Sequence, residues 1–287
     1  MTARVGAFVA FCVARHQVYV NRVVRGLSKP WTGDPILQAY RFCNVYRELD
    51  TVTQWIRQKW SPKLGGHPDA WFWMVVARLV NHPTTLAAAG FDLRREWEGY
   101  NDTNFFTIME TRKAQGVKAF GSAYIVSTNG HTMEKHLYLD DHVLTPLWRN
   151  KHAYRPTPTD TLASFHKRLI TANGLGSFMA AQVVADTKNT HGDHLHTAED
   201  WWTWAAPGPG SMRGLSRVLF QDKDHRFRDA QFLVDLNELQ DYVNAAFVKR
   251  GWQKLCAQDV QNCLCEFDKY ERVRLGQGKP RQRYAGV

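Results

Sequence analysis

The sequence predicts a mainly α protein, and three observations lead to this class. Apolar residues recur at helical spacing along most of the chain, Gly and Pro separate these segments, and strand patterns do not alternate with helical ones. No internal repeat is present. With 287 residues, of which 44% are hydrophobic and 22% charged, the chain is long enough to bury one large core or two small ones.

Helical periodicity predicts eight helices. In chain order they lie at about 1–30, 37–57, 70–81, 84–90, 161–172, 177–187, 231–250 and 257–275. A further helix is expected within the charged stretch 91–116. A small irregular or β insertion is expected at 116–127, and three prolines predict irregular chain over 146–158.

The segment 37–57 is expected to form a single helix with one apolar stripe. Phe42, Val45 and Tyr46 begin this stripe at helical spacing. At 3.6 residues per turn, Arg41 and Arg47 fall on the adjoining polar face. The helix would therefore present both arginines on one side.

The composition favours a polyanionic partner without identifying one. Lys and Arg number 37 against 27 Asp and Glu, which gives a net charge of +10. A charge of this sign attracts nucleic acid, but many basic proteins bind none. The 11 tryptophans can fill a core, and their flat faces can also stack on bases taken out of a duplex.

The cysteines and the apolar N-terminal run indicate a cytoplasmic protein. The 5 cysteines are an odd number, and no pair has zinc-finger spacing, which favours a reducing compartment over a disulfide framework. The apolar run 5–14 is shorter than the ~20 residues that span a bilayer. It is followed by no clear small-x-small cleavage site, so we expect a buried helix.

The segment 161–187 is expected to form a helix, a tight hairpin and a second helix. The residues expected to bind a DNA phosphate are Asn173, Gly174, Gly176 and Ser177. Hairpin amides and the positive end of the second helix, which Ser177 can cap, both attract an anion. The alternative is that Gly174 is a helix C-cap and Gly176 part of a turn between packed helices.

Asp200 is the first candidate for a catalytic group. It precedes Trp201, Trp202 and Trp204, which are candidates for stacking on the target base. Aromatic neighbours would partly desolvate the carboxylate and make it a better base near neutral pH. The alternative is a helix N-cap, and the two roles are compatible. Asp186 is a weaker candidate for the same role.

The Pro-Gly-Pro-Gly loop that follows is a candidate for pyrophosphate binding. Gly208, Gly210 and Ser211 offer backbone positions close to an anion, with Arg213 and Arg217 as charge partners. The alternative is a plain turn that leads into a helix.

Other chemistry is not indicated by the sequence. His191, His194 and His196 cluster in a spacer, but a loop seldom supplies a fixed metal geometry, so no metal site is predicted. No phosphate-loop motif and no Gly-x-Ser-x-Gly elbow occurs.

Several longer strings together resemble one known family. They are AYRFCNVYRELDTVTQWI (39–56), FWMVVARLVNHP (72–83), GLGSFMAAQVVAD (174–186), DWWTWAAPGPGSMRGLSRV (200–218) and LCAQDVQNCLCEFDKYERVRLGQGKPRQRY (255–284). The chain resembles the bacteriophage amino acid:DNA transferases, once called α-glutamyl/putrescinyl-thymine pyrophosphorylases. Their domain is shared with the helical domain of 5-hydroxymethyluracil DNA kinases.

The resemblance implies both a fold and a reaction. The fold would be that of the helix-hairpin-helix DNA glycosylases, with one helical domain of two lobes over 1–287. In those enzymes a catalytic Asp follows the hairpin and precedes a helix with Arg-Val, and Asp200 and Arg217-Val218 take these places here at longer spacing. The transferase would replace the pyrophosphate on the hydroxymethyl group of the base with an amine, glycine being favoured.

The implied partners are double-stranded DNA carrying pyrophosphorylated hydroxymethyluracil and a free amino acid or polyamine, in the cytoplasm of an infected bacterium and without a membrane. Arg41, Arg47, Arg213 or Arg217 would stabilise the leaving pyrophosphate. No particular cofactor is implied, and a divalent cation stays open. Two alternatives remain: a glycosylase acting on a modified base, and a non-catalytic DNA-binding module.

Overall fold

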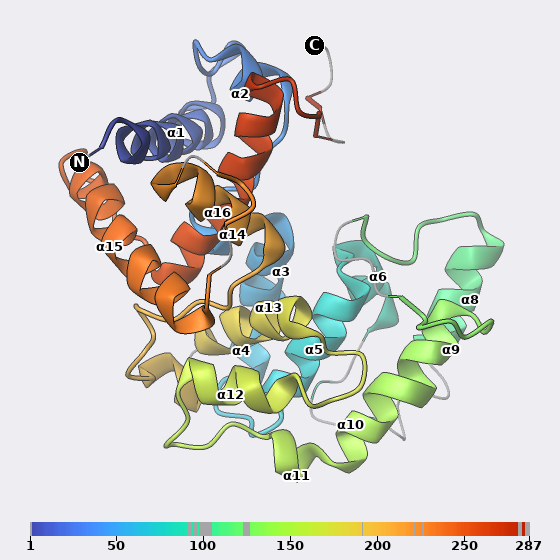
Figure 1. The fold of residues 1–287 in the computed structure, drawn as a ribbon. Coiled ribbons are helices and arrows are strands. Elements are labelled where there is room, and N and C mark those ends of the chain that lie inside the picture. The colour runs from blue at the N-terminus through green and yellow to red at the C-terminus, as the bar shows by residue number, and fades with distance from the viewer. Residues whose placement is uncertain are drawn as a thin grey trace. The chain divides into compact units, whose positions relative to one another are not determined.

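The computed structural model describes residues 2–90, 93, 97, 105–122, 127–190, 192–220, 222–225, 227–280 and 283–284 (Figure 1). Helices dominate these residues, and their β pairing is limited to an isolated antiparallel bridge between Tyr40 and Arg283. The mainly α class is therefore confirmed. Of the expected irregular or β insertion at 116–127, residues 123–126 lie outside the described residues, and 116–122 and 127 form no strand.

The packing of the chain divides it into two compact units. The first unit consists of Met1–Asp50 and Trp202–Val287, and we call it the terminal unit. The second consists of Thr51–Trp201, and we call it the central unit. The central unit is thus continuous in sequence, whereas the terminal unit combines two separate segments.

The terminal unit is built on three long helices around an aromatic core. Its elements are α1 (Ala3–Tyr19), η1 (Val20–Val24), α2 (Pro35–Ala39), η2 (Arg47–Leu49), α14 (Pro209–Leu219), α15 (Asp229–Val248) and α16 (Ala257–Arg274). α1 contacts α14, α15 and α16, and α14 crosses α16 (Figure 1). Phe8 and Phe11 of α1 pack on Phe267 of α16, with ring centres 5.3 and 5.5 Å apart.

Two glycines allow α14 to approach α16 closely. A Cβ atom on Gly214 would lie 2.1 Å from the carbonyl oxygen of Leu264, and one on Gly210 would lie 2.5 Å from the Sγ of Cys265. Such distances are far below van der Waals contact, so only glycine fits at this crossing. The glycines one turn apart in this sequence therefore determine how the two helices pack.

The central unit surrounds one completely buried helix. Its elements are α3 (Thr51–Lys59), α4 (Ser61–Leu64), α5 (Ala70–Val80), α6 (Pro83–Ala89), α8 (Phe106–Ala114), α9 (Lys135–Leu139), η4 (Asp140–Leu144), α10 (Thr145–Arg149), α11 (Lys151–Tyr154), α12 (Leu162–Leu169), α13 (Ser177–Lys188) and η5 (His194–Thr197). Every residue of α5 is buried, as expected for a helix that is apolar almost all round. α13 packs against α5, and α12 packs against α13.

Most of the expected helices are confirmed within a few residues. α5, α6, α12, α13, α15 and α16 lie where periodicity predicts them, and α8 lies within 91–116. The first helical segment ends at Val24, earlier than expected. The prediction of irregular chain over 146–158 is partly wrong, because α10 and α11 reach Tyr154. Pro146 is the second residue of α10, which follows η4 without a break.

The single helix expected over 37–57 is wrong. α2 ends at Ala39 and α3 begins at Thr51, with Tyr40 extended between them. Arg41 and Arg47 therefore do not share a helix face.

Carboxylates of α16 explain this break. The backbone N–H of Cys43 donates to Oε2 of Glu266 (3.1 Å), and that of Arg47 donates to Oδ1 of Asp259 (2.9 Å). These bonds satisfy amides that a helix would have satisfied locally, while Phe42 enters the core. The apolar spacing was real, but tertiary hydrogen bonds decide the backbone.

No helix of the described chain is both long and apolar enough to cross a bilayer.

His16 lies in an aromatic environment of the terminal unit. Its ring centre lies 4.5 Å from that of Trp252, 4.9 Å from that of Tyr46 and 5.7 Å from that of Phe247. Burial, with the neighbouring charge of Arg15, lowers the pKa of His16 from 6.5 to about 4. The imidazole is therefore neutral in the folded protein at pH 7.

We predict that the Gly214→Ala protein is less stable than the native one by about 1–3 kcal/mol, because the added methyl group meets a backbone carbonyl that cannot move away alone. Urea denaturation measures this difference. Gly33→Ala is the matched control, since a Cβ atom there would have no neighbour within 4 Å. An equal effect at both positions would contradict the close crossing of α14 and α16.

We predict that His16 makes the stability depend on pH between about 6.5 and 4. Its folded pKa is the lower one, so its contribution is complete above pH 6.5 and is lost as the pH falls through that range, up to about 3 kcal/mol. His16→Phe should remove this part of the dependence.

Urea denaturation at pH 4.5 and pH 7 measures the effect as the difference between variant and native protein. This difference is needed because Asp193 contributes with the opposite sign: burial raises its pKa to about 6, so its contribution falls as the pH rises toward 6. If both proteins lose the same free energy of unfolding on acidification, His16 does not titrate as described.

Candidate functional site

Leu175 and Gly174 fix the hairpin between α12 and α13. Leu175 is buried, and Gly174 has a φ of +78°, which favours glycine. A Cβ atom on Gly174 would also lie 2.5 Å from Cγ2 of Val143 in η4. The tight contact fixes the hairpin and leaves Gly176 exposed, with nothing within 4 Å of the position of a Cβ atom.

The first turn of α13 faces solvent without a side-chain cap. The N-cap residue is Gly176, so the expectation that Ser177 caps this helix is wrong; Ser177 is its first residue. Asn173 is exposed, and its Nδ2 donates to the carbonyl oxygen of His142 (2.8 Å). The four residues expected at the hairpin are thus together on one turn, next to the positive end of α13.

Asp200 caps a helix, but that helix is α12. Its Oδ1 accepts from the N–H of Leu162 (2.7 Å) and its Oδ2 from the N–H of Ala163 (3.0 Å). The half-buried carboxylate is therefore fixed at the start of α12, whereas the hairpin follows its end. The eight residues of α12 separate the two features by about 12 Å.

Asp186 lies inside the central unit. Its Oδ1 accepts from Nη2 of Arg78 (2.6 Å) and its Oδ2 from Nε of the same residue, while Thr53 accepts a second bond from Nη2 (2.7 Å). Both charged side chains are almost completely buried. The pair joins α13 to α5, and its two carboxylate oxygens are engaged there.

The three tryptophans differ in exposure. Trp202 is 51% exposed, Trp204 is buried and Trp201 is half-buried. Nζ of the buried Lys188 lies 4.0 Å from the ring centre of Trp201 and 3.3 Å from its carbonyl oxygen. A cation over a ring face occupies that face. Trp202 is therefore the best placed of the three to stack on a base. No pattern in the sequence indicates the role of Lys188.

Arginines of α14 and α16 converge on one buried carboxylate. Asp268 is 1% exposed and contacts Nε of Arg217 (2.9 Å), of Arg213 (3.1 Å) and of Arg272 (3.5 Å). Three guanidinium groups against one carboxylate leave a local excess of positive charge. Sequence reasoning found Arg213 and Arg217 but missed Asp268 and Arg272, which the helical spacing of α16 alone does not distinguish.

Arg41 and Arg47 have other partners. The Arg41 guanidinium lies 5.6 Å from the ring centre of Tyr284, and Nη1 of Arg47 donates to Oδ1 of Asn262 (3.4 Å).

The Pro-Gly loop forms the start of α14. The N–H of Gly208 donates to Oγ of Ser211 (3.0 Å), and that hydroxyl also accepts from Nε2 of Gln261 (3.1 Å). Ser211 is fully buried, and Gly210 faces α16. The geometry is that of a turn leading into a helix, the alternative considered above for this loop.

His194 and His196 lie in η5, while His191 is outside the described residues. Among the residues that the structure describes, no three His, Cys, Asp or Glu side chains are grouped so that they could hold a metal ion.

Comparison with known proteins assigns the family. The family described as the helical domain of 5-hmdU DNA kinase matches residues 2–279, and the chain belongs to it. A relative is the 5-hmdU DNA kinase of Bacillus phage SP10, which is 23% identical over 283 residues. The match covers 90% of this chain and 43% of the relative, so the chain spans less than half of that protein. No solved structure matches the chain.

We predict that Arg78→Met lowers the stability by about 3–5 kcal/mol, because it leaves the carboxylate of Asp186 buried without its partner. Urea denaturation measures this loss. The double variant Arg78→Met/Asp186→Leu should recover much of it, since neither charge remains. Additive losses from the two substitutions would show that the pair does not act as a unit.

Proposed function

We propose that this protein takes part in the hypermodification of thymidine in phage DNA, as a transferase that replaces the pyrophosphate of 5-(pyrophosphoryloxymethyl)uracil with an amine. An amino acid is the favoured nucleophile, and glycine the first choice among them. The proposal is supported by membership of the 5-hmdU DNA kinase helical-domain family. The observation that carries it is the exposed hairpin preceded by a helix that a carboxylate caps.

The hairpin would bind a phosphate of the DNA strand beside the target base. Gly176 is exposed and has no side chain, so a phosphate can approach the amides of the first turn of α13 closely. The target base would leave the duplex and stack on a tryptophan. Trp202 is the best candidate because of its exposure, with Trp201 and Trp204 behind it.

Asp200 would act as the general base. An amino acid is mostly protonated at neutral pH, so its ammonium group must lose a proton before the nitrogen can attack. A carboxylate has four lone-pair sites, and the two bonds to α12 leave others for that proton. The bonds to α12 also hold the group in one orientation. Asp186 would have a structural role instead, as the buried ion-pair partner of Arg78.

In the transfer, the amine nitrogen forms a bond to the methylene carbon of the base. The bond from that carbon to oxygen breaks, and pyrophosphate leaves with the electron pair. These bonds can form and break in one step, or in two steps through an activated methylene intermediate. Pyrophosphate leaves with several negative charges, which arginines stabilise.

Arg213 and Arg217 are the first candidates to bind it, because Asp268 holds both in place and the Arg213 side chain is 40% exposed. Arg41 and Arg47 are the second pair. Gly208, Gly210 and Ser211 would contribute by fixing the start of α14. A divalent cation would help to neutralise the negative charge of the leaving pyrophosphate.

We predict that the protein, given duplex DNA with pyrophosphorylated hydroxymethyluracil and a mixture of amino acids, forms one amino-acid adduct and releases pyrophosphate. Mass spectrometry of the nucleosides measures the adduct. Asp200→Asn should lower turnover by about 10²–10⁴-fold, the usual contribution of a general base, with DNA binding retained. Glu199→Gln is the matched control, since Glu199 is the exposed neighbouring carboxylate.

Other outcomes assign another function. Abasic sites would identify a glycosylase, which cuts the base from the sugar. If the protein binds the DNA but leaves it unchanged with every common amine and polyamine, it is a DNA-binding module without transferase activity. Thermal denaturation of Asp200→Asn separates a lost base from a weakened cap of α12, which costs about 1 kcal/mol.

A further inference from the structure

Four cationic side chains gather around three aromatic rings in the terminal unit. The cations are Arg22, Lys29, Arg41 and Arg283, and the rings are those of Trp31, Tyr40 and Tyr284; we call this group the cation–ring cluster. All four cations are exposed. They come from three separate segments of the chain, so only the fold brings them together.

The rings hold the cations at short distances. The Arg22 guanidinium lies 5.2 Å from the ring centre of Trp31 and 5.4 Å from that of Tyr284. Nζ of Lys29 lies 5.5 and 5.9 Å from the same two centres. The Arg283 guanidinium lies 5.2 Å from the ring centre of Tyr40. Contacts of this kind orient a cation and leave its charge available to solvent.

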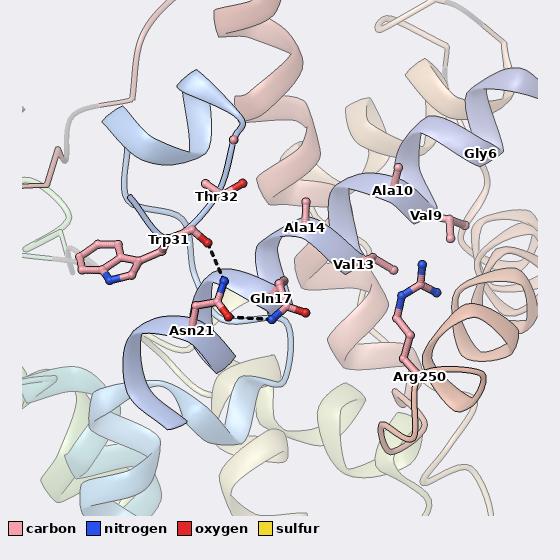
Figure 2. Close-up of a pocket in the computed structure, with 11 residues that line it drawn as sticks. Gly6, Val9, Ala10, Val13, Ala14, Gln17, Asn21, Trp31, Thr32 and Arg250 are labelled. Carbon is pink, nitrogen blue, oxygen red and sulfur yellow. Dashed lines mark hydrogen bonds between the residues drawn. The ribbon is translucent and has the colours of Figure 1, made fainter. Parts of the chain in front are cut away.

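The platform under the cations is fixed by hydrogen bonds. Nδ2 of Asn21 donates to the carbonyl oxygen of Trp31 (2.9 Å), as Figure 2 shows, and the indole Nε1 donates to the carbonyl oxygen of Leu27 (2.7 Å). In the same view the indole points away from Val13 and the rest of the ~540 Å³ pocket that the residues of Figure 2 line. Tyr284 is anchored by its N–H, which donates to the carbonyl oxygen of Ala39 (3.2 Å).

The three arginines of the cluster have no carboxylate partner among the residues that the structure describes. Within the described part of the chain, none of Arg22, Arg41 and Arg283 forms an ion pair with a carboxylate. The arginines of α14 and α16, by contrast, share Asp268. Like charges within about one Debye length repel each other, so an anion bound between them would relieve a real cost.

We propose that the cation–ring cluster binds the phosphate backbone of duplex DNA. Arg22, Lys29 and Arg41 surround the ring of Tyr284, and Arg283 lies on the ring of Tyr40. The positive charge therefore covers two neighbouring positions, as a row of phosphates does. Tyr40 and Tyr284 are buried, so their faces do not offer a platform for unstacked bases. Contact with the backbone alone makes the binding independent of sequence. The proposal does not rest on the transferase reaction.

The test is the salt dependence of binding to unmodified duplex DNA. Each phosphate contact contributes about 0.9 to the slope of log K against log salt concentration, so Arg22→Gln/Arg283→Gln should lower that slope by roughly 2. Between 50 and 200 mM salt, the native protein should then lose about tenfold more affinity than the double variant. Arg41 is left unchanged, because it is also a candidate for pyrophosphate.

Two control proteins make the result specific. Lys249→Gln/Arg250→Gln removes the same charge from exposed positions after α15 and should keep the native slope. Arg22→Lys/Arg283→Lys keeps the charge and should also keep the slope. Equal thermal denaturation of all variants excludes unfolding as the cause.

Three results would overturn the proposal. The first is an unchanged slope in Arg22→Gln/Arg283→Gln, and the second is an equal loss in the Lys249→Gln/Arg250→Gln control. The third is evidence that the cluster binds another ligand. Such evidence would be tighter binding of single-stranded than of duplex DNA, or competition by pyrophosphate at concentrations too low to act through ionic strength. Failure of transfer activity, in contrast, leaves the salt slope on unmodified DNA intact.

Discussion

The terminal unit depends on the need to satisfy the carboxylates of α16. A buried carboxylate is costly unless donors or cations surround it. Glu266 and Asp268 are 3% and 1% exposed, so partners must come to them. Glu266 draws in the amide of Cys43, and Asp268 draws in the arginines of α14. These contacts determine both the extended path after α2 and the position of α14, whose glycines permit the close approach.

The sequence predicts those parts of the fold that depend on interactions between residues close together in the chain. α5, α13, α15 and α16 are predicted well because their apolar spacing and their ends are local properties. The segment 37–57 is not, since its amides bond to residues more than 200 positions away.

The candidate site shows the same limit. The residue type of Asp200 predicts a helix cap, but the capped helix begins 38 positions earlier, which no local pattern reveals. Gly210 is predictable as a turn former, and its contact with α16 is not. Lys188 and Asp268 were missed because a charged residue within a helix is normally exposed. The family, in contrast, is predicted from long strings, and the match over 2–279 confirms the relation to 5-hmdU DNA kinases.

The division of the chain has a consequence for its synthesis. The central unit is complete once Trp201 has been made, whereas α1 must wait for α14 to α16 before its core partners exist. At typical elongation rates this wait is on the order of ten seconds or more, during which the apolar face of Phe8 and Phe11 has no native cover. During synthesis α1 thus remains without its core partners, whereas every element of the central unit is already present.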